Sequence, residues 1–314
     1  MRIVDVTAQP AGAIPLAEVS GLALGRTRGD TTVVAAIGDR AATIAWAELA
    51  ADGAAAPLKW QTLPLSHAAG TRIPQQDPQL EAIAMDGGGR ILLVQEWPCR
   101  AEYIDAVQRK VLARFTLTVP DKAGPQALRR SWADPTGSHA EGVALMRDGH
   151  LLIVKEKDPA ALLEFGPAGD APGGFGPDRW LPAGQPWYDV PDSPEPFEAD
   201  LELLACWAPS GGTSAVCPDL SDADVVPGGN LIVLSDKGRS VALVPASAPA
   251  PQPFSGAFEP DVVWRVSGIE DKPEGIVVLP DGDVLVACDR RKSTKNLFRI
   301  SRGEWDRPGS IGPV

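Results

Sequence analysis

One short phrase recurs in this chain: Leu80-Glu81-Ala82-Ile83-Ala84, Ala140-Glu141-Gly142-Val143-Ala144 and Pro273-Glu274-Gly275-Ile276. Each copy continues through an apolar segment and a glycine turn into a second apolar segment that ends on an acid. The leading and trailing acids are fifteen positions apart in all three copies: Glu81 with Glu96, Glu141 with Glu156, and Glu274 with Asp289. Two looser copies begin at Ser20 and Asp222 and end at Asp39 and Asp236. A repeat of this kind indicates an array of similar structural units.

Each copy predicts a β-hairpin, because two apolar segments flank turn residues such as Arg147-Asp148-Gly149. The second segments, such as Leu151-Leu152-Ile153-Val154, are apolar throughout and do not alternate. A strand that is apolar on both faces has to be covered on both faces. Since no long helical pattern is present to cover the sheets, we expect sheets stacked radially around an axis. The sequence therefore predicts an all-β fold, a single β-propeller.

The spacing of the copies predicts the number of blades. Their starts at residues 20, 81, 141, 222 and 274 fit five blades, and the wide gap between the third and fourth copies leaves six as the alternative. We expect one domain over residues 1–314, with a long insertion at about 165–218 that is rich in Trp and Pro. Residues 2–6 are expected to close the ring against the last blade. The recurring Ala23, Ala84 and Ala144 suit strands that are crowded near an axis.

Composition excludes several classes of partner. The net charge of −12 would repel the phosphates of nucleic acid and of anionic membrane surfaces, so neither is expected as a partner. No apolar stretch approaches the length of a membrane span and no signal peptide is visible, so a cytoplasmic location is expected. The four cysteines show no CxxC spacing. Buried reduced thiols are the favoured interpretation, with a Cys206–Cys217 disulfide as the alternative.

Hairpin geometry predicts that the acids gather on one face, because both ends of an antiparallel hairpin lie at the same edge. The outcome would be two concentric rings. The inner ring would contain Ser20, Glu81, Glu141, Asp222 and Glu274, and the outer ring Asp39, Glu96, Glu156, Asp236 and Asp289. Two carboxylates about 5 Å apart repel by roughly 3 kcal/mol at an effective dielectric constant near 20. Such rings need a source of neutralising charge.

Three sources of neutralisation remain open. A Ca²⁺ or Mg²⁺ ion could be held by Glu81, Glu141, Asp222 and Glu274, because these ions prefer oxygen ligands. Protein cations such as Arg40, Lys157 and Arg290, which follow trailing acids, could instead form a belt of ion pairs. Buried carboxyl groups could also stay protonated or be bridged by water.

His139 is the candidate catalytic residue. It stands two positions before Glu141, where an imidazole could act as acid or base near neutral pH. The alternative is a loop histidine bonded to the backbone. Trp97 follows Glu96 and is the aromatic residue expected closest to the pocket. A substrate pocket would then be formed by Ser20, Asp39, Glu96, Trp97, Glu156, Asp236 and Asp289.

The repeated phrases around Glu81, Glu141 and Glu274 resemble the SdiA-regulated and phytase-esterase-like propellers and, more distantly, the gluconolactonase group. The resemblance covers the five hairpins, about half of the chain. It implies a propeller with an axial Ca²⁺ ion and, for the lactonase group, metal-assisted hydrolysis of small esters. Only Glu81, Glu141, Asp222 and Glu274 match an acidic position at a strand start. The asparagine ligands of the lactonases have no counterpart at the matching positions.

Two function classes follow from these patterns. The first is a metal-assisted hydrolase of small esters or lactones, in which His139 or a free carboxylate activates water. The second is a non-catalytic scaffold that holds a structural cation and binds a small ligand or a protein partner. Motifs of serine hydrolases, zinc proteases and nucleotide-binding proteins are missing from the sequence.

Overall fold

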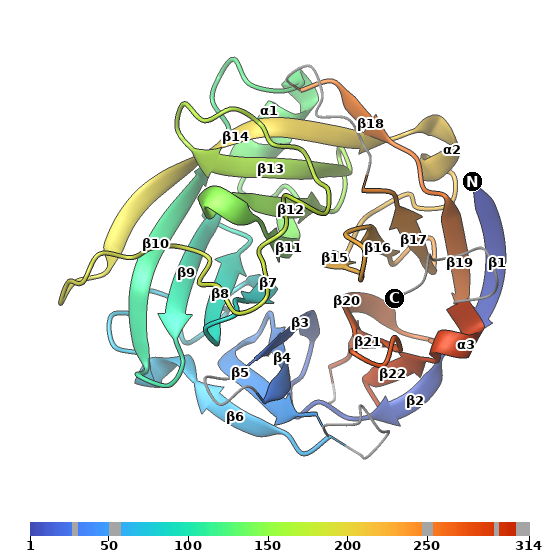
Figure 1. The fold of residues 1–314 in the computed structure, drawn as a ribbon, viewed down its shortest axis with the longest axis horizontal. Helices are drawn as coiled ribbons and strands as arrows, with labels where there is room; N and C mark the ends of the chain where they lie inside the picture. The colour runs from blue at the N-terminus through green and yellow to red at the C-terminus, as the bar shows by residue number, and fades with distance from the viewer. Residues whose placement is uncertain (27–30, 50–57, 247–253, 292–294, 306–314) are drawn as a thin grey trace.

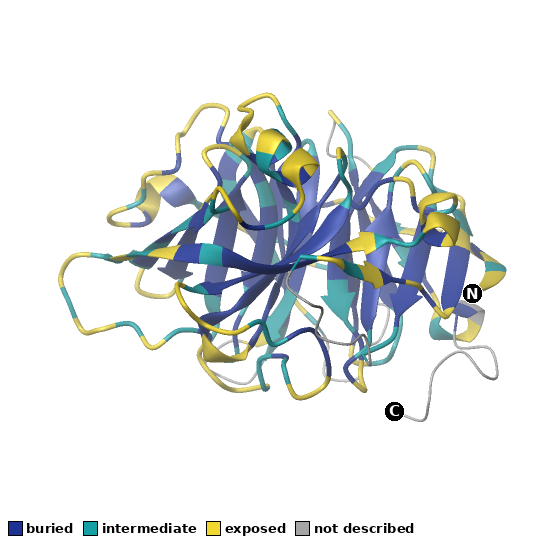
Figure 2. Ribbon diagram, turned by 90° about the horizontal axis from the view of Figure 1, so that it is seen from above, coloured by how far each residue is buried: buried dark blue, intermediate teal, exposed yellow. Residues whose placement is uncertain are grey.

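The computed structural model describes residues 1–26, 31–49, 58–246, 254–291 and 295–305. These residues form twenty-two strands, three short α-helices and two turns of 3₁₀-helix. The sheets stand around a common centre (Figure 1). Buried strands fill the middle of the molecule, and exposed loops cover its two faces (Figure 2). The prediction of an all-β, propeller-like fold is confirmed.

Each sheet contains at least one group of three or four strands that follow one another along the chain, and strands from elsewhere complete some of the sheets. The first contains β3 (Val19–Arg26), β4 (Thr32–Gly38), β5 (Ala41–Glu48) and β6 (Gln61–Pro64). The last contains β20 (Lys272–Val278), β21 (Val284–Asp289), β22 (Leu297–Ile300) and, from the start of the chain, β2 (Gln9–Gly12). The one before it contains β15 (Asp222–Val225), β16 (Leu231–Ser235), β17 (Ser240–Val244), β19 (Val262–Ser267) and β1 (Arg2–Thr7).

The largest sheet joins two such groups. One group is β7 (Leu80–Met85), β8 (Arg90–Gln95), β9 (Arg100–Asp105) and β10 (Lys110–Thr118). The other is β11 (Ala140–Leu145), β12 (Leu151–Lys155), β13 (Ala161–Pro167) and β14 (Phe197–Pro209), which also pairs with β18 (Gly256–Phe258). Parallel pairing of β10 with β14 connects the two groups. The helices are α1 (Gln126–Ala133), α2 (Gly211–Ser214) and α3 (Arg302–Trp305), and the 3₁₀ turns are Leu65–His67 and Arg147–Gly149.

The five innermost strands form a closed ring. β3 contacts β7, β7 contacts β11, β11 contacts β15, β15 contacts β20, and β20 contacts β3. These strands are the first strands of the five hairpins in the repeat, and they lie nearest the centre in Figure 1. The second strands are buried on both faces, as their apolar composition predicts: every residue of β12 and β16 is buried. The repeat therefore places the leading residues of the copies around one axis.

The start of the chain closes the molecule differently from the prediction. Residues 2–6 were expected to pair with the last blade, but β1 pairs in parallel with β19 of the preceding sheet. The strand that completes the last sheet is β2, which pairs antiparallel with β22. The alternation of exposed and buried residues in β1 is typical of a strand at the rim, and this pattern does not specify which sheet it joins.

The insertion after β13 packs against the sheets. Residues 168–196 form a loop, and β14 follows it as a thirteen-residue strand between β13 and β10. Trp180 and Trp187 are buried, and their indole N–H groups donate to the carbonyl oxygens of Gly229 and His150 at 2.7 and 2.9 Å. The buried Glu164 carboxylate accepts from the backbone N–H groups of Gly173 and Gly174. Through these contacts the tryptophans anchor the loop on the sheets.

Cys99, Cys206, Cys217 and Cys288 are free and buried, as favoured from the sequence. None of the described helices has both the length and the apolar character needed to cross a membrane.

Candidate functional site

Three glutamates occupy the same position in three hairpins. Glu81, Glu141 and Glu274 each lie at an irregularity in the pairing of the innermost strand, where one residue is left over between two ladder pairs. Such a bulge turns its side chain away from the regular alternation of the strand. Because β7, β11 and β20 surround one axis, the three carboxyl groups influence one another electrostatically. The predicted convergence of acids therefore has a local cause in the strand geometry.

The fourth hairpin is displaced by one residue relative to the predicted alignment. Asp222 pairs with Leu234, in the register where Ala82 pairs with Val94 and Gly142 pairs with Val154. The residue that corresponds to the three glutamates is therefore Ser221. In the first hairpin the corresponding residue is Ser20, at the irregularity between Val19 and Gly21, as predicted. The inner positions of the five hairpins thus carry three glutamates and two serines.

Asp222 and Asp224 bind the backbone of the neighbouring innermost strand. The Asp222 carboxylate accepts from the N–H groups of Ile276 at 2.9 Å and Ala223 at 2.8 Å. Asp224 accepts from the N–H of Val278 at 2.7 Å. A Cβ atom on Gly142 would lie 2.5 Å from an Asp222 oxygen, so glycine is needed there. The two aspartates satisfy N–H groups on the axial edge of β20. The role of Asp222 as a metal ligand stays a prediction.

Burial and mutual repulsion raise the pKa values of the three inner glutamates. Burial, followed by the charges of Glu141, Glu274 and Glu96, raises the pKa of Glu81 well above its usual range. Burial and the charges of Glu96 and Glu156 raise the pKa of Glu141 to about 8. Burial raises the pKa of Glu274 to about 7, although Lys272 opposes this shift. Carboxyl groups that titrate near neutral pH can act as general acids or bases.

Protein cations neutralise part of this acidic cluster. The Lys272 ammonium forms an ion pair with Glu274, and its charge also acts on Glu141 and Glu156. Lys157 forms an ion pair with Glu156. Sequence reasoning proposed Lys157 as such a cation but missed Lys272, although a lysine two residues before the acid of a repeated phrase was a visible signal. No ion pair of Glu81 or Glu141 is found among the described residues.

The outer-ring residues surround this cluster with differing contacts. Burial raises the pKa of Asp39 to about 6, while the nearby Arg40 opposes the shift. Burial raises the pKa values of Glu96, Asp236 and Asp289 as well. Glu156 is bound to Lys157, and Arg239 lies 4.0 Å from Asp236. Ser20 donates its hydroxyl hydrogen to the carbonyl of Leu80 and thereby ties the first hairpin to the second.

His139 is completely buried. Its Nε2–H donates to the carbonyl of Trp132 at 3.1 Å, so in the neutral ring Nδ1 carries the lone pair. Nδ1 has no hydrogen-bond partner and lies 3.9 Å from a Glu96 oxygen. Burial lowers the pKa of the imidazole. Trp97, which is exposed, packs against the ring at a centroid distance of 5.4 Å.

We expect His139→Ala to lower the free energy of unfolding by about 2 kcal/mol, because it removes a buried ring that packs between Trp97 and Trp132. Urea denaturation would measure this loss. His67→Ala is the matched control, since His67 is exposed and should tolerate the change. A stability equal to that of the control would show that the buried ring contributes nothing to folding.

Lys155 is a buried cation beside the cluster. Its side chain is fully buried, and its ammonium donates to the carbonyl oxygens of Ser138, at 2.7 Å, and Lys157. Burial lowers its pKa to about 8, an effect that the nearby carboxylates oppose. These contacts join the segment before β11 to the end of β12.

The cluster contains carboxylate groups, as a calcium site does, but these groups are not arranged as the ligands of one ion. Carboxylate oxygens are the ligands that Ca²⁺ prefers. Within the described ranges, no three His, Cys, Asp or Glu side chains are grouped so that they could hold a metal ion. The Lys272 ammonium group also forms an ion pair with Glu274, one of the carboxylates of the inner ring. The residues as they stand therefore do not fit a resident ion.

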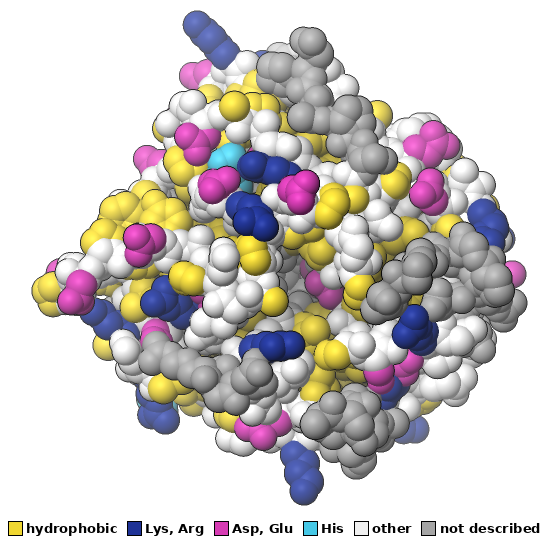
Figure 3. All heavy atoms as spheres, in the orientation of Figure 1, with side chains coloured by type: hydrophobic (Ala, Val, Ile, Leu, Met, Phe, Trp, Pro, Cys, Tyr) yellow, Lys and Arg dark blue, Asp and Glu magenta, His cyan; other side chains and the backbone are white. Residues whose placement is uncertain are grey.

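A cavity of about 320 Å³ lies further along the same innermost strands. Ala23, Ala84 and Ala144 line it, together with Asp224 and the segment from Trp180 to Gly184. The sequence predicted that these small side chains suit strands crowded near an axis, and in the structure they also border open space there. The face seen in Figure 3 is hollowed near its centre.

Comparison of the sequence with protein families and with curated proteins finds no match. Among solved structures, the fold is similar to that of a glutaminyl cyclase from Myxococcus xanthus, with 12% identity, coverage of 96% of this chain and 98% of that chain, and a TM-score of 0.47. A streptogramin B lyase matches with 12% identity, coverage of 92% and 94%, and a TM-score of 0.43. A Bacteroides caccae protein of unknown function matches with 15% identity and a TM-score of 0.38, over 82% of this chain and only 65% of its own length.

Proposed function

We propose that the chain is a five-bladed propeller whose axial acidic cluster hydrolyses small esters or lactones by acid–base catalysis. One observation carries this proposal: Glu81, Glu141 and Glu274 converge from three hairpins, and burial with mutual repulsion moves their pKa values toward or above neutrality. A purely structural belt of ion pairs would need charged glutamates, and it gives no reason for carboxyl groups with raised pKa values to surround the axis. The choice of esters and lactones rests on the resemblance of the repeated phrases to the lactonase propellers.

Two residues would share the proton transfers. Glu96 accepts a proton from a water molecule while the water oxygen forms a bond to the carbonyl carbon of the substrate. Glu141, whose pKa of about 8 keeps it protonated at neutral pH, donates its proton to the leaving oxygen as the ester bond breaks. Exchange with solvent returns both groups to their starting forms. His139 does not touch substrate in this scheme, because it is buried, and acts as a positioning residue behind Glu96.

We expect Glu141→Gln to lower kcat/KM at least about 100-fold, since glutamine cannot donate the proton. The measurement uses a panel of lactones and aryl esters between pH 5 and pH 9, in chelator-treated buffer. Glu195→Gln is the control, because Glu195 is exposed in the loop before β14. The absence of turnover with every member of the panel would overturn the proposed activity.

Binding of a Ca²⁺ or Mg²⁺ ion is a separate proposal, favoured by the two inner glutamates without an ion pair. It requires the glutamates to move together and Lys272 to release Glu274. Calcium should then raise the melting temperature at pH 8, where the ion competes with protons for the inner carboxyl groups, and the increase should disappear in Glu81→Gln. A melting temperature that is unchanged by calcium and by chelator would contradict it.

One specific observation favours the second function class, the non-catalytic scaffold. The ion pairs of Lys272 with Glu274 and of Lys157 with Glu156 neutralise acids without any ligand, as a scaffold would need. Stabilisation by calcium without turnover would support a non-catalytic propeller that binds a small ligand or a protein partner. A cytoplasmic location and the absence of nucleic-acid and membrane partners also stay predictions.

A further inference from the structure

A second cavity, which the inner glutamates do not line, lies over strands β9, β10 and β14. Its volume is about 300 Å³, and polar side chains of all three strands line it. Strand register arranges these side chains in rows. In one row Arg114 stands between Glu102 and Glu198, and in the next row Thr116 stands between Arg100 and Asp200. The two rows carry similar charges but differ in how those charges are satisfied.

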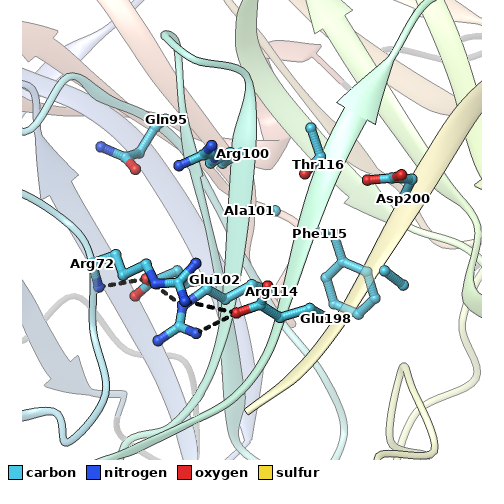
Figure 4. A pocket seen from close by; sticks show the side chains of 11 residues that line it. Arg72, Gln95, Arg100, Ala101, Glu102, Arg114, Phe115, Thr116, Glu198 and Asp200 are labelled. Atoms are coloured by element: carbon cyan, nitrogen blue, oxygen red, sulfur yellow. Dashed lines mark hydrogen bonds and ion pairs between the residues drawn. The ribbon is translucent and has the colours of Figure 1, made fainter.

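The first row is a closed network. Arg114 donates to Glu102 at 3.3 Å and to Glu198 at 3.0 Å, and Arg72 binds Glu198 at 2.9 Å. Glu102 is buried and also accepts from the backbone N–H of Arg72 at 2.7 Å. Dashed lines in the lower part of Figure 4 mark these contacts. Each charged group of this row therefore has a partner of opposite charge within the protein, and the row forms one boundary of the cavity.

The second row leaves both of its charges open. Arg100 and Asp200 lie on opposite sides of Thr116 in Figure 4. Neither has an ion-pair partner within the part of the chain that the structure describes, and both are exposed. Two strand spacings separate their Cα atoms by about 10 Å, so a direct ion pair is not built into the sheet. A positive and a negative group thus face the same cavity with a hydroxyl group between them.

We propose that this cavity binds a zwitterion of amino-acid or dipeptide size. Arg100 binds the carboxylate of the ligand, because a guanidinium group can donate two parallel hydrogen bonds to it. Asp200 binds the ammonium group, and Thr116 lies between the two ends. A ligand with charges at both ends spans a gap that neither side chain closes alone. The volume of about 300 Å³ suits a ligand of this size.

The test compares L-alanyl-L-alanine with its two blocked forms. N-acetyl-L-alanyl-L-alanine lacks the ammonium group, and L-alanyl-L-alaninamide lacks the carboxylate. Titration calorimetry on the full chain should detect the zwitterion with a Kd of about 1 mM and show at least about tenfold weaker binding of each blocked form. Equal binding of all three compounds, or no binding of the zwitterion at about 10 mM, would overturn the proposal.

Charge reversal gives a second, independent readout. Arg100→Asp and Asp200→Arg should each weaken binding of the zwitterion at least about tenfold. The double variant exchanges the two charges and should restore binding, with the carboxylate and the ammonium group of the ligand in exchanged positions. Arg130→Asp and Asp121→Arg are matched controls on exposed residues outside the cavity. Melting curves identify any variant that fails to fold, and Thr116→Val then tests the cavity with both charges retained. Failure of the double variant to regain binding, despite a native melting curve, would contradict the charge pairing.

Discussion

Replacing Asp222 with alanine should lower the free energy of unfolding by about 3 kcal/mol, because buried N–H groups lose their acceptor. Asp222 is buried at the axis and accepts from Ile276 on β20 and from Ala223. Alanine restores no acceptor, and the neighbouring Gly142 cannot fill the space. The lost hydrogen bonds also join two adjacent hairpins, so the change weakens the ring at its centre.

Urea denaturation at pH 7 would measure this loss. Asp192→Ala is the control, since Asp192 is exposed in the insertion and its replacement should stay within about 0.5 kcal/mol of wild type. Ser221→Ala distinguishes the two neighbouring positions, because Ser221 has the register of the inner glutamates and should have a smaller effect. A loss below about 1 kcal/mol in Asp222→Ala would show that water replaces the carboxylate at the axis.

Raising the pH from 5 to 8 should lower the free energy of unfolding by about 3 kcal/mol through the inner glutamates. A carboxyl group whose pKa is raised by folding stabilises the native state in its protonated form. That contribution is fully present below the unfolded value near 4.5 and is lost as the pH rises through the folded values of about 7 for Glu274 and about 8 for Glu141. Stability should therefore decrease across this interval.

Glu141→Gln should flatten this dependence, because glutamine stays neutral at every pH. The variant is then more stable than wild type at pH 8 and similar to it at pH 5. Charged groups that act on Glu141 include Glu96, Glu156, Glu274 and Lys272, and they keep their own titrations. Glu195→Gln is again the control, with an unchanged slope. A wild-type stability that stays constant or increases between pH 5 and pH 8 would contradict the raised pKa values.

Two kinds of acidic side chain lie at the axis, and they differ in what binds their oxygens. At one level Asp222 and Asp224 accept from backbone N–H groups of β20, so their oxygens are already engaged. At the level of the glutamates the acids face one another, and Lys272 neutralises only some of their charge. The engaged aspartates support the ring, whereas the glutamates are only partly neutralised by Lys272.

Much of the architecture could be predicted from the repeat. Doubly apolar segments after glycine turns predict buried second strands, and the spacing of Glu81, Glu141 and Glu274 predicts acids at one end of the hairpins. Both conclusions depend on local patterns: turn residues specify where a strand ends, and burial on two faces excludes an exposed sheet. The convergence of the glutamates follows from their equal positions in equal units.

Three features depended on tertiary structure. The register of the fourth hairpin places Ser221 in line with the glutamates, and a shift of one residue sends Asp222 to another face of the strand. The contact of Lys272 with Glu274 and the burial of His139 depend on neighbouring segments that local sequence does not specify. The sequence by itself determined the repeated hairpins and their acidic ends, because these depend on turns and apolar periodicity. Only packing around the axis decided that Asp222 and Asp224 accept hydrogen bonds from the backbone, that Glu274 pairs with a lysine, and that Glu81 and Glu141 lie near other acids.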